Sequence, residues 1–331
     1  MIKFKNYYFF MKIFYTYFFI SFTFTILFSG CESSKPMKIS SIQRLDLSEI
    51  PSASGIEFVN GYYWIIGDNS PYLFRLDQKF ELIDKMVLGS LDDAVHGVIP
   101  KLKKLDLEAM LSMKWKKDSV FFVFGSGSKL PERAFAWKIN IKNPALQEKI
   151  DLTVFYDLVM NETKLKENDF NIEAAVELNG KIYLFNRGRN KLISMRSAQF
   201  IEFIEGDRKE LKLKSYNIDL PKIGGIEAGF SGATADEKNN RIIFTASVEN
   251  TTDWVADGEV LGSLIGLIDV DDIENHYEPS TVLITEINGD AIRFKVESIA
   301  LKNRSQQSYN CVLVTDSDGG KSELVELTLN F

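Results

Sequence analysis

Short apolar runs separated by polar clusters recur along most of this chain. The clearest unit is residues 171–191, in which two apolar segments flank the dipeptide Asn179-Gly180. Asn-Gly suits the positive φ angles of a two-residue turn, so this stretch predicts a β-hairpin. Because a hairpin folds back on itself, we expect Glu173 at its start and Arg187 at its end to share one edge.

Four other segments repeat the order of polar marker, apolar strand, turn and apolar strand. The five markers, which are spaced 54, 65, 58 and 66 residues apart, are Ser54, Glu108, Glu173, Ser231 and Glu297. Divergent hairpins at such intervals are typical of propeller blades with four strands each. We predict an all-β fold, a five-bladed β-propeller of four-stranded antiparallel blades. A six-bladed ring and a β-sandwich are the alternatives, and Glu227-Ala228 leaves the register of the fourth repeat open.

The last repeat is too short to supply four strands, since few residues follow Glu297. Residues 37–47 have the pattern of a strand. We expect this N-terminal strand to complete the last blade and close the ring, which removes an open sheet edge.

The first 31 residues have the pattern of a secretory signal. Lysines precede an apolar run over residues 13–28, and Ser29-Gly30-Cys31 follows. The end of this run resembles the lipobox of bacterial lipoproteins, although Phe28 stands where leucine is usual. We expect a lipoprotein signal peptide over residues 1–30, a lipidated Cys31 with a tether over residues 31–39, and one propeller domain over residues 40–331.

An uncleaved transmembrane anchor is the alternative to this signal. The true start is Met1 or Met11, because Met11-Lys12 also makes a well-proportioned beginning. We expect the protein in the cell envelope, attached to the outer membrane by its lipid.

The composition supports a large core and excludes one class of partner. Hydrophobic residues make up 45% of the chain and aromatic residues 12%, while the formal net charge is −7. This charge makes nucleic acid an unsuitable partner. Cys311 lies in an apolar strand, where we expect a buried small residue.

The candidate chemistry follows from propeller geometry. The start of each first strand and the end of each second strand face the same mouth of the channel. The markers are then flanked there by polar residues from the second strands: Asp68, Asn69, Ser126, Arg187, Ser247 and Asp316. Carboxylates on a narrow ring repel one another unless a cation or a proton intervenes, and Ca²⁺ prefers such oxygen ligands. The alternative is that these groups tie neighbouring blades together.

Other chemistry finds little support. His96 and His276 are the only histidines, which excludes a His-rich zinc centre. No Gly-x-Ser-x-Gly elbow is present. Trp254 lies in a segment that departs from the repeat and is either a loop residue at the mouth or a buried one.

Several short motifs resemble those of the phytase-like and SdiA-regulated propeller proteins. They are Ser54-Gly55-Ile56, Gly67-Asp68-Asn69 and Asp106-Leu107-Glu108-Ala109-Met110, with Ala109 where that family usually has glycine. The whole chain looks most like a group of uncharacterised bacterial propeller lipoproteins in that neighbourhood. The resemblance implies a propeller with possible calcium at the mouth. It does not carry over a phosphatase activity, because the histidines and dense basic residues expected for phytate are not visible.

Three functions fit these observations. The first is a binding module that holds a metal ion, a small polar ligand or a partner protein of the envelope at the mouth. The second is a calcium-dependent hydrolase of phosphate or carboxylic esters, in which Glu108 and Glu173 hold the ion or act as base and Arg187 steadies the anion. The third is a structural role in an envelope complex.

Overall fold

The predicted hairpin around Asn179-Gly180 is present in the structure. In the computed structural model, strands β10 (Ile172–Leu178) and β11 (Lys181–Asn186) pair in antiparallel register across this turn. Asn179 has φ of 50° and Gly180 has φ of 78°, as the sequence pattern requires. The structure describes residues 36–100, 103–251, 258–286, 289, 292–316 and 322–331. Cys31, the predicted signal peptide and Trp254 lie outside these residues.

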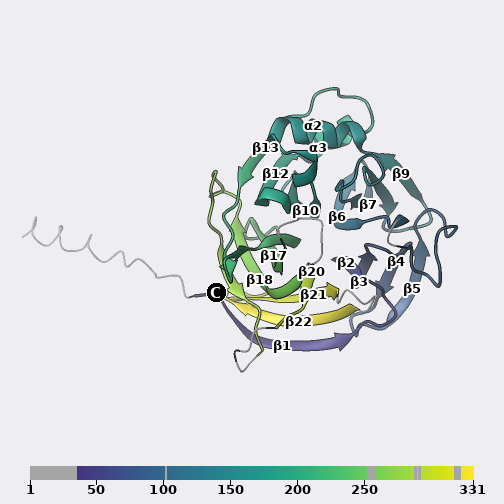
Figure 1. Cartoon of the computed structure of the whole chain (residues 1–331). Helices are drawn as coiled ribbons and strands as arrows, with labels where there is room; N and C mark the ends of the chain where they lie inside the picture. The colour runs from purple at the N-terminus through teal and green to yellow at the C-terminus, as the bar shows by residue number, and fades with distance from the viewer. Residues whose placement is uncertain (1–35, 101–102, 252–257, 287–288, 290–291, 317–321) are drawn as a thin grey trace, which may run out of the picture. The chain divides into compact units, whose positions relative to one another are not determined.

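Five four-stranded antiparallel sheets form the five blades of a β-propeller (Figure 1). Blade 1 contains β2 (Ala53–Val59), β3 (Tyr62–Gly67), β4 (Tyr72–Leu76) and β5 (Leu82–Val87). Blade 2 contains β6 (Leu107–Trp115), β7 (Asp118–Gly125), β8 (Phe135–Asn140) and β9 (Gln147–Asp151). Blade 3 contains β10, β11, β12 (Lys191–Arg196) and β13 (Lys214–Asn217).

The last two blades follow the same order. Blade 4 contains β16 (Gly229–Asp236), β17 (Arg241–Asn250), β18 (Glu259–Asp269) and β19 (Ser280–Leu283), and a two-stranded sheet of β14 (Lys222–Ile223) and β15 (Ile226–Glu227) precedes it. Blade 5 contains β20 (Lys295–Arg304), β21 (Ser308–Asp316), β22 (Ser322–Asn330) and β1 (Lys38–Asp46). The predicted five-bladed fold is therefore confirmed.

The N-terminal strand closes the ring, as the sequence predicts. β1 pairs with β22 in antiparallel register from Lys38 opposite Asn330 to Asp46 opposite Glu323. Blade 5 is thus built from both ends of the propeller unit, Met37–Asn330.

The hydrophobic pattern follows the position of a strand within its blade. In β7, six successive residues from Val120 to Gly125 are buried, because both faces of the sheet pack on neighbouring blades. In the outer strand β5, half-buried and exposed positions alternate from Leu82 to Lys85, and no residue of the strand is fully buried. The cores lie between adjacent blades; Phe185 of blade 3, for example, packs edge-on against Phe230 of blade 4 with ring centroids 5.0 Å apart.

Within the part of the chain that the structure describes, two α-helices break the all-β pattern, and the sequence did not predict them. They are α2 (Thr153–Thr163) and α3 (Ser197–Ile204), with the 3₁₀ turns η2 (Glu167–Asp169) and η3 (Gly188–Asn190) nearby. Phe155 and Phe200 bring the two helices into the core between blades 2 and 3. Among the described residues, no helix is long and apolar enough to cross a membrane.

Candidate functional site

All five marker residues occupy one kind of backbone position, the extra residue of a β-bulge. In each blade the pairing between the first and second strands skips one residue, and the skipped residues are Ser54, Glu108, Glu173, Ser231 and Glu297. A bulge bends its strand and re-aims the side chain of the extra residue, and bulges are frequent beside functional sites. The propeller therefore repeats the same local distortion five times, at the same end of each inner strand.

The bulges also settle the register of the fourth repeat. Ser231 is the bulge residue of β16, whereas Glu227 belongs to the separate strand β15. Glu227-Ala228 is therefore not the counterpart of Glu108-Ala109. The residue after each bulge is small, namely Gly55, Ala109, Ala174, Gly232 and Ser298.

Charged side chains at the mouth form two groups, and the first lies between blades 1 and 2. We call it the Lys104 cluster; it consists of Asp68, Lys104, Asp106, Glu108 and Arg133. Lys104 Nζ lies 2.8 Å from Asp68 Oδ2 and 2.7 Å from Asp106 Oδ1, and Arg133 contacts the other Asp106 oxygen at 2.7 Å. A backbone hydrogen bond from Asp106 N to Asp68 O, 2.8 Å long, fixes the Lys104 segment against blade 1.

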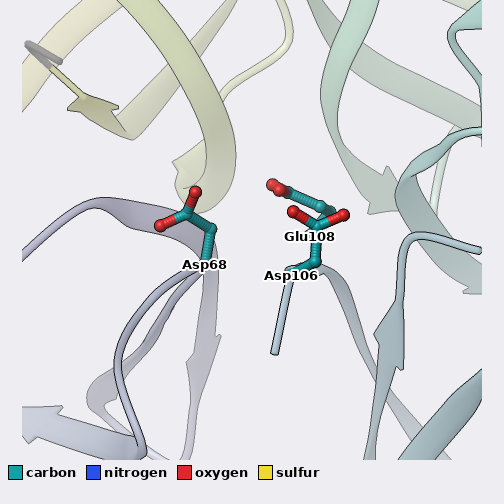
Figure 2. Close-up of side chains that lie close together, drawn as sticks. All are labelled: Asp68, Asp106 and Glu108. Carbon is teal, nitrogen blue, oxygen red and sulfur yellow. The ribbon is translucent and has the colours of Figure 1, made fainter. Parts of the chain in front are cut away.

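Three carboxylates of this cluster converge. Oxygens of Asp68, Asp106 and Glu108 all lie within 4.8 Å of one another. Figure 2 shows Asp106 and Glu108 side by side, facing Asp68 across a gap. Asp68 and Glu108 are half-buried, while Asp106 is buried.

The environment separates the pKa values of these groups. Burial acts to raise the pKa of Asp106, but Lys104 and Arg133 outweigh it, so the pKa lies below its ordinary value. For Glu108, burial and the negative charges of Asp106, Glu173 and Asp68 raise the pKa well above its ordinary value. Burial thus shifts Glu108 toward its protonated form, whereas the two cations hold Asp106 toward its ionised form.

Glu108 also differs from its neighbours in its contacts. Among the described residues, no side chain or backbone group forms a hydrogen bond or ion pair with the Glu108 carboxyl group. In the same cluster Asp68 Oδ1 is buried, as is Oδ1 of the next residue, Asn69, and neither has a hydrogen-bond partner within the described part of the chain. Buried acceptors without donors are uncommon and call for a ligand, a water molecule or a proton.

The second group lies over blades 3, 4 and 5. We call it the Arg187 cluster; it consists of Glu173, Arg187, Glu249, Lys295 and Glu297. Arg187 donates to Glu249 Oε1 at 2.8 Å and to the carbonyl oxygen of Phe230 at 3.4 Å. Lys295 Nζ lies 3.3 Å from Glu249 Oε1 and 3.1 Å from Glu297 Oε1. Asn171 donates to Glu173 Oε1 at 2.7 Å.

Burial is also the main influence on the pKa values of the carboxyl groups in the Arg187 cluster. It raises the pKa of Glu297 to about 8, although Lys295 acts in the opposite direction. Burial also raises the pKa of Glu173 despite Arg187 and Lys295. Lys295 keeps its proton, because Glu297 and Glu249 outweigh the effect of burial and raise its pKa well above the usual range.

Both clusters have the same charge balance. Each contains three carboxyl groups and two cationic side chains, so each carries one excess negative charge when every carboxyl group is ionised. Asp316 adds a further negative charge beside Glu297, whose pKa it helps to raise. Burial is the main cause of the raised pKa values of Glu108 and Glu297, and the neighbouring negative charges add to it.

Many of the same groups connect neighbouring blades. Ser54 Oγ donates to the carbonyl of Leu107 at 2.5 Å, and Ser247 Oγ donates to that of Val296 at 3.0 Å. The ion pairs of Lys104 with Asp68 and of Arg187 with Glu249 also cross between blades. Polar groups at the mouth therefore connect neighbouring blades, which is the alternative role that the sequence left open for them. Glu108 forms none of these contacts.

The other sequence candidates have varied surroundings. Asn69 donates to Ser52 Oγ at 2.9 Å, and Ser231 donates to Thr245 Oγ1 at 3.1 Å. Ser126 donates to Asp106 Oδ2. Outside the mouth, Cys311 is buried and His96 is exposed.

Sequence reasoning did not place five charged residues in the site: Lys104, Asp106, Arg133, Glu249 and Lys295. Part of the signal was present, since Lys104, Asp106 and Glu108 are two residues apart, as are Lys295 and Glu297. Alternate residues of an extended chain share a side. Arg133 and Glu249 carry no such signal, because they reach the site from a loop after β7 and from the far end of β17.

Comparison with known proteins identifies the family. Residues 49–329 match the model of a family of unknown function, DUF6929. The chain belongs to the DUF6929 family. No curated protein matches this DUF6929 chain.

Solved structures with similar architecture are distant in sequence. Glutaminyl cyclase from Myxococcus xanthus is 11% identical with a TM-score of 0.49, covering 89% of this chain and 96% of its own. Virginiamycin B lyase from Staphylococcus aureus is 11% identical with a TM-score of 0.37, covering 88% of this chain and 99% of its own. At such identities and scores, neither activity is carried over to the DUF6929 chain.

Proposed function

We propose that this DUF6929 chain is a lipid-anchored propeller of the cell envelope that binds a small, positively charged polar ligand at the mouth of its channel. The observation that carries the proposal is Glu108, a half-buried carboxyl group at the mouth without a hydrogen bond or ion pair among the described residues. Every other carboxylate of the two clusters contacts a donor of the chain.

The charge balance supports the class of ligand. The Lys104 cluster lacks one positive charge, and a ligand with one protonated amine supplies it. Such an amine pairs with the carboxylate of Glu108 and also offers a donor to Asp68, whose Oδ1 is buried without a partner in the described residues. Hydrogen bonds that join charged groups are stronger than neutral ones.

The location is supported by the N-terminal sequence. The lysines, the apolar run and Ser29-Gly30-Cys31 are the parts of a lipoprotein signal. With Cys31 acylated, the tether before β1 holds the propeller close to the membrane. Metabolic labelling with a fatty-acid analogue, lost in Cys31→Ser, tests this part of the proposal.

The second candidate function is the calcium-dependent hydrolase of the phytase-like type, with the ester of a phosphate or carboxylic acid as substrate. The converging carboxylates Asp68, Asp106 and Glu108 favour it. However, Lys104 and Arg133 contact both oxygens of Asp106, and Lys104 also contacts Asp68. Ca²⁺ takes about six to eight oxygen ligands. The residues therefore do not fit this ion while Lys104 holds its position. For this reason we favour binding of an amine over calcium-dependent hydrolysis.

Thermal unfolding of the full chain separates these functions. The additives are ethanolamine, the uncharged ethylene glycol as its control, CaCl₂ and EDTA. The variants are Glu108→Gln, Lys104→Met and, as a matched control, Lys103→Met, which removes an exposed lysine paired with Asp93 in the same segment. A ligand that binds only the folded state raises the melting temperature.

We expect ethanolamine, and not ethylene glycol, to stabilise wild type and Lys103→Met but not Glu108→Gln. We expect Ca²⁺ to stabilise only Lys104→Met, in which the lysine no longer occupies the carboxylates. Stabilisation of wild type by Ca²⁺ alone overturns the proposal in favour of the hydrolase, and an ester-hydrolysis assay with Glu173→Gln then follows. No response to any additive overturns it in favour of a structural envelope component.

A further inference from the structure

A groove crosses the outer part of blade 3, on the periphery of the ring and away from the channel. Its volume is about 900 Å³. Five cationic side chains line it: Lys181, Arg196, Lys209, Lys212 and Lys214. All five are exposed. Two acidic residues, Glu162 and Glu210, also line the groove.

These cations lack counter-ions. None of the five forms an ion pair with a residue that the structure describes. Elsewhere on the surface lysines and arginines are commonly paired, as Lys138 is with Glu148 and Arg241 with Asp269. The groove concentrates unpaired positive charge on a chain whose formal net charge is −7.

The strand register brings the cations together. Lys181 of β11 lies directly opposite Arg196 of β12, and Ser194 of β12 lies directly opposite Lys214 of β13. Like charges directly opposite one another in a sheet are destabilising. The fold therefore accepts an electrostatic cost at Lys181 and Arg196 that no described contact offsets.

Protection of the sheet edge explains only part of this arrangement. Exposed lysines on an edge strand discourage pairing with other chains, and Lys214 on the outer strand β13 suits that role. Lys181 and Arg196 lie on the two inner strands β11 and β12, where there is no edge to protect.

We propose that this groove binds an acidic polysaccharide. Carboxylate or sulfate groups along such a chain supply the counter-ions for the row of cations. The lining also includes Ser194, Gln199 and Tyr216, whose side chains carry polar groups that suit sugar hydroxyls. This mixture of charged and neutral polar groups favours a glycan over an anion without hydroxyl groups.

The groove shape disfavours a bilayer surface. A flat bilayer does not enter a groove whose lining comes from α2, from blade 3 and from the segment after β18. Nucleic acid carries its negative charge on a phosphate backbone, which polyphosphate represents in the test. Asp271 lies near the wall formed by Val270 and Ile273, where it helps to raise the pKa of Tyr183, so the anionic groups of the ligand should lie along the blade 3 side.

The test is affinity electrophoresis and calorimetry of the full chain with polygalacturonate and heparin, at about 0.15 M salt. Dextran is the uncharged control, and polyphosphate and anionic lipid vesicles are the competing polyanions. The test variant is Lys181→Glu/Arg196→Glu. The matched control is Lys117→Glu/Lys142→Glu, which changes the net charge equally at two exposed lysines of blade 2.

We expect an acidic polysaccharide to bind wild type and the control variant with similar Kd. We expect the test variant to weaken binding about tenfold or more, because charge reversal turns attraction into repulsion. Glu108→Gln should bind the polysaccharide unchanged, which separates this site from the channel mouth. Equal loss in both charge-reversal variants, binding only to vesicles or polyphosphate, or no binding at all overturns the proposal.

Discussion

At the scale of single residues, the mouth is short of positive charge, and protons make up the difference. Glu297 is 5% exposed and lies 3.1 Å from Lys295, yet its pKa is raised to about 8, mainly by burial. In the unfolded chain this carboxyl group returns to its ordinary pKa near 4.5. The folded state therefore binds one more proton than the unfolded state between these two pH values.

This difference sets the sign of the pH dependence. Where the native state binds more protons, the free energy of unfolding falls as the pH rises. We expect Glu297 to contribute a fall of about 1.4 kcal/mol per pH unit between about pH 5 and pH 8. Urea unfolding at a series of pH values measures the slope for wild type and for Glu297→Gln. The variant should retain only the part due to other groups such as Glu57, whose pKa burial also raises to about 8. An unchanged slope in Glu297→Gln would mean that Glu297 does not contribute to the pH dependence of the free energy of unfolding.

The marker residues of the mouth were predictable from the sequence, but most of their partners were not. Markers repeat at regular intervals, so five short motifs were enough to bring Glu108, Glu173 and Glu297 to one end of the channel. Arg133 and Glu249 occur once each, in segments that no repeat marks. Which lysine neutralises which carboxylate depends on side-chain packing between blades, and spacing along the chain does not encode it.

At the scale of the element, the unit of this fold is a hairpin whose first strand carries a bulge followed by a small residue. At Gly232, an added Cβ would lie 2.5 Å from Ser298 Cα and 3.0 Å from Glu297 O, both backbone atoms of the next blade. The small residue thus lets two inner strands approach closely. The bulge before it places Ser231, whose hydroxyl donates to Thr245 Oγ1 of the neighbouring strand.

We expect Gly232→Ala to lower the free energy of unfolding by about 2–3 kcal/mol, as overpacking does. The adjacent Ser231→Ala is the matched control. It removes one hydrogen bond to Thr245 and should cost about 1 kcal/mol. Chemical unfolding compares the two variants, and a smaller cost for Gly232→Ala than for Ser231→Ala is the result that would refute close packing at this position.

Hairpins were more predictable than helices. An Asn-Gly dipeptide predicts a two-residue turn directly, since few other dipeptides accept two positive φ angles. Helix α3, Ser197–Ile204, has eight residues and is rich in Phe and Ile, which also suit a strand. Helix α2 begins after Leu152 without a side-chain cap and has no acidic residue in its first turn. Both helices exist because their apolar faces fill the core between blades 2 and 3, a tertiary effect that local sequence does not show.

At the scale of the whole propeller unit, the ring depends on one strand from the other end of the chain. β1 covers β22 along its length, and Arg44 donates to Glu323 at 2.8 Å and 2.9 Å across this pair. Without β1, the backbone groups of β22 form an open edge, which favours association between chains.

We expect deletion of residues 1–46 to lower the melting temperature and to cause self-association. Deletion of residues 1–36 is the control, because the propeller unit begins at Met37. Size-exclusion chromatography with light scattering and thermal unfolding give the two readouts. A monomer with the melting temperature of the control would mean that β1 is dispensable for closure.

The pairing of Lys38 with Asn330 has a further consequence for the engineering of this chain. Two positions almost three hundred residues apart in sequence are neighbours within one sheet. A short linker can join them, and new ends can be opened between blades 4 and 5, before β20. In such a circular permutant every blade would be continuous in sequence. In the natural order β1 cannot pair until β22 has been synthesised, and the permutant would remove this delay.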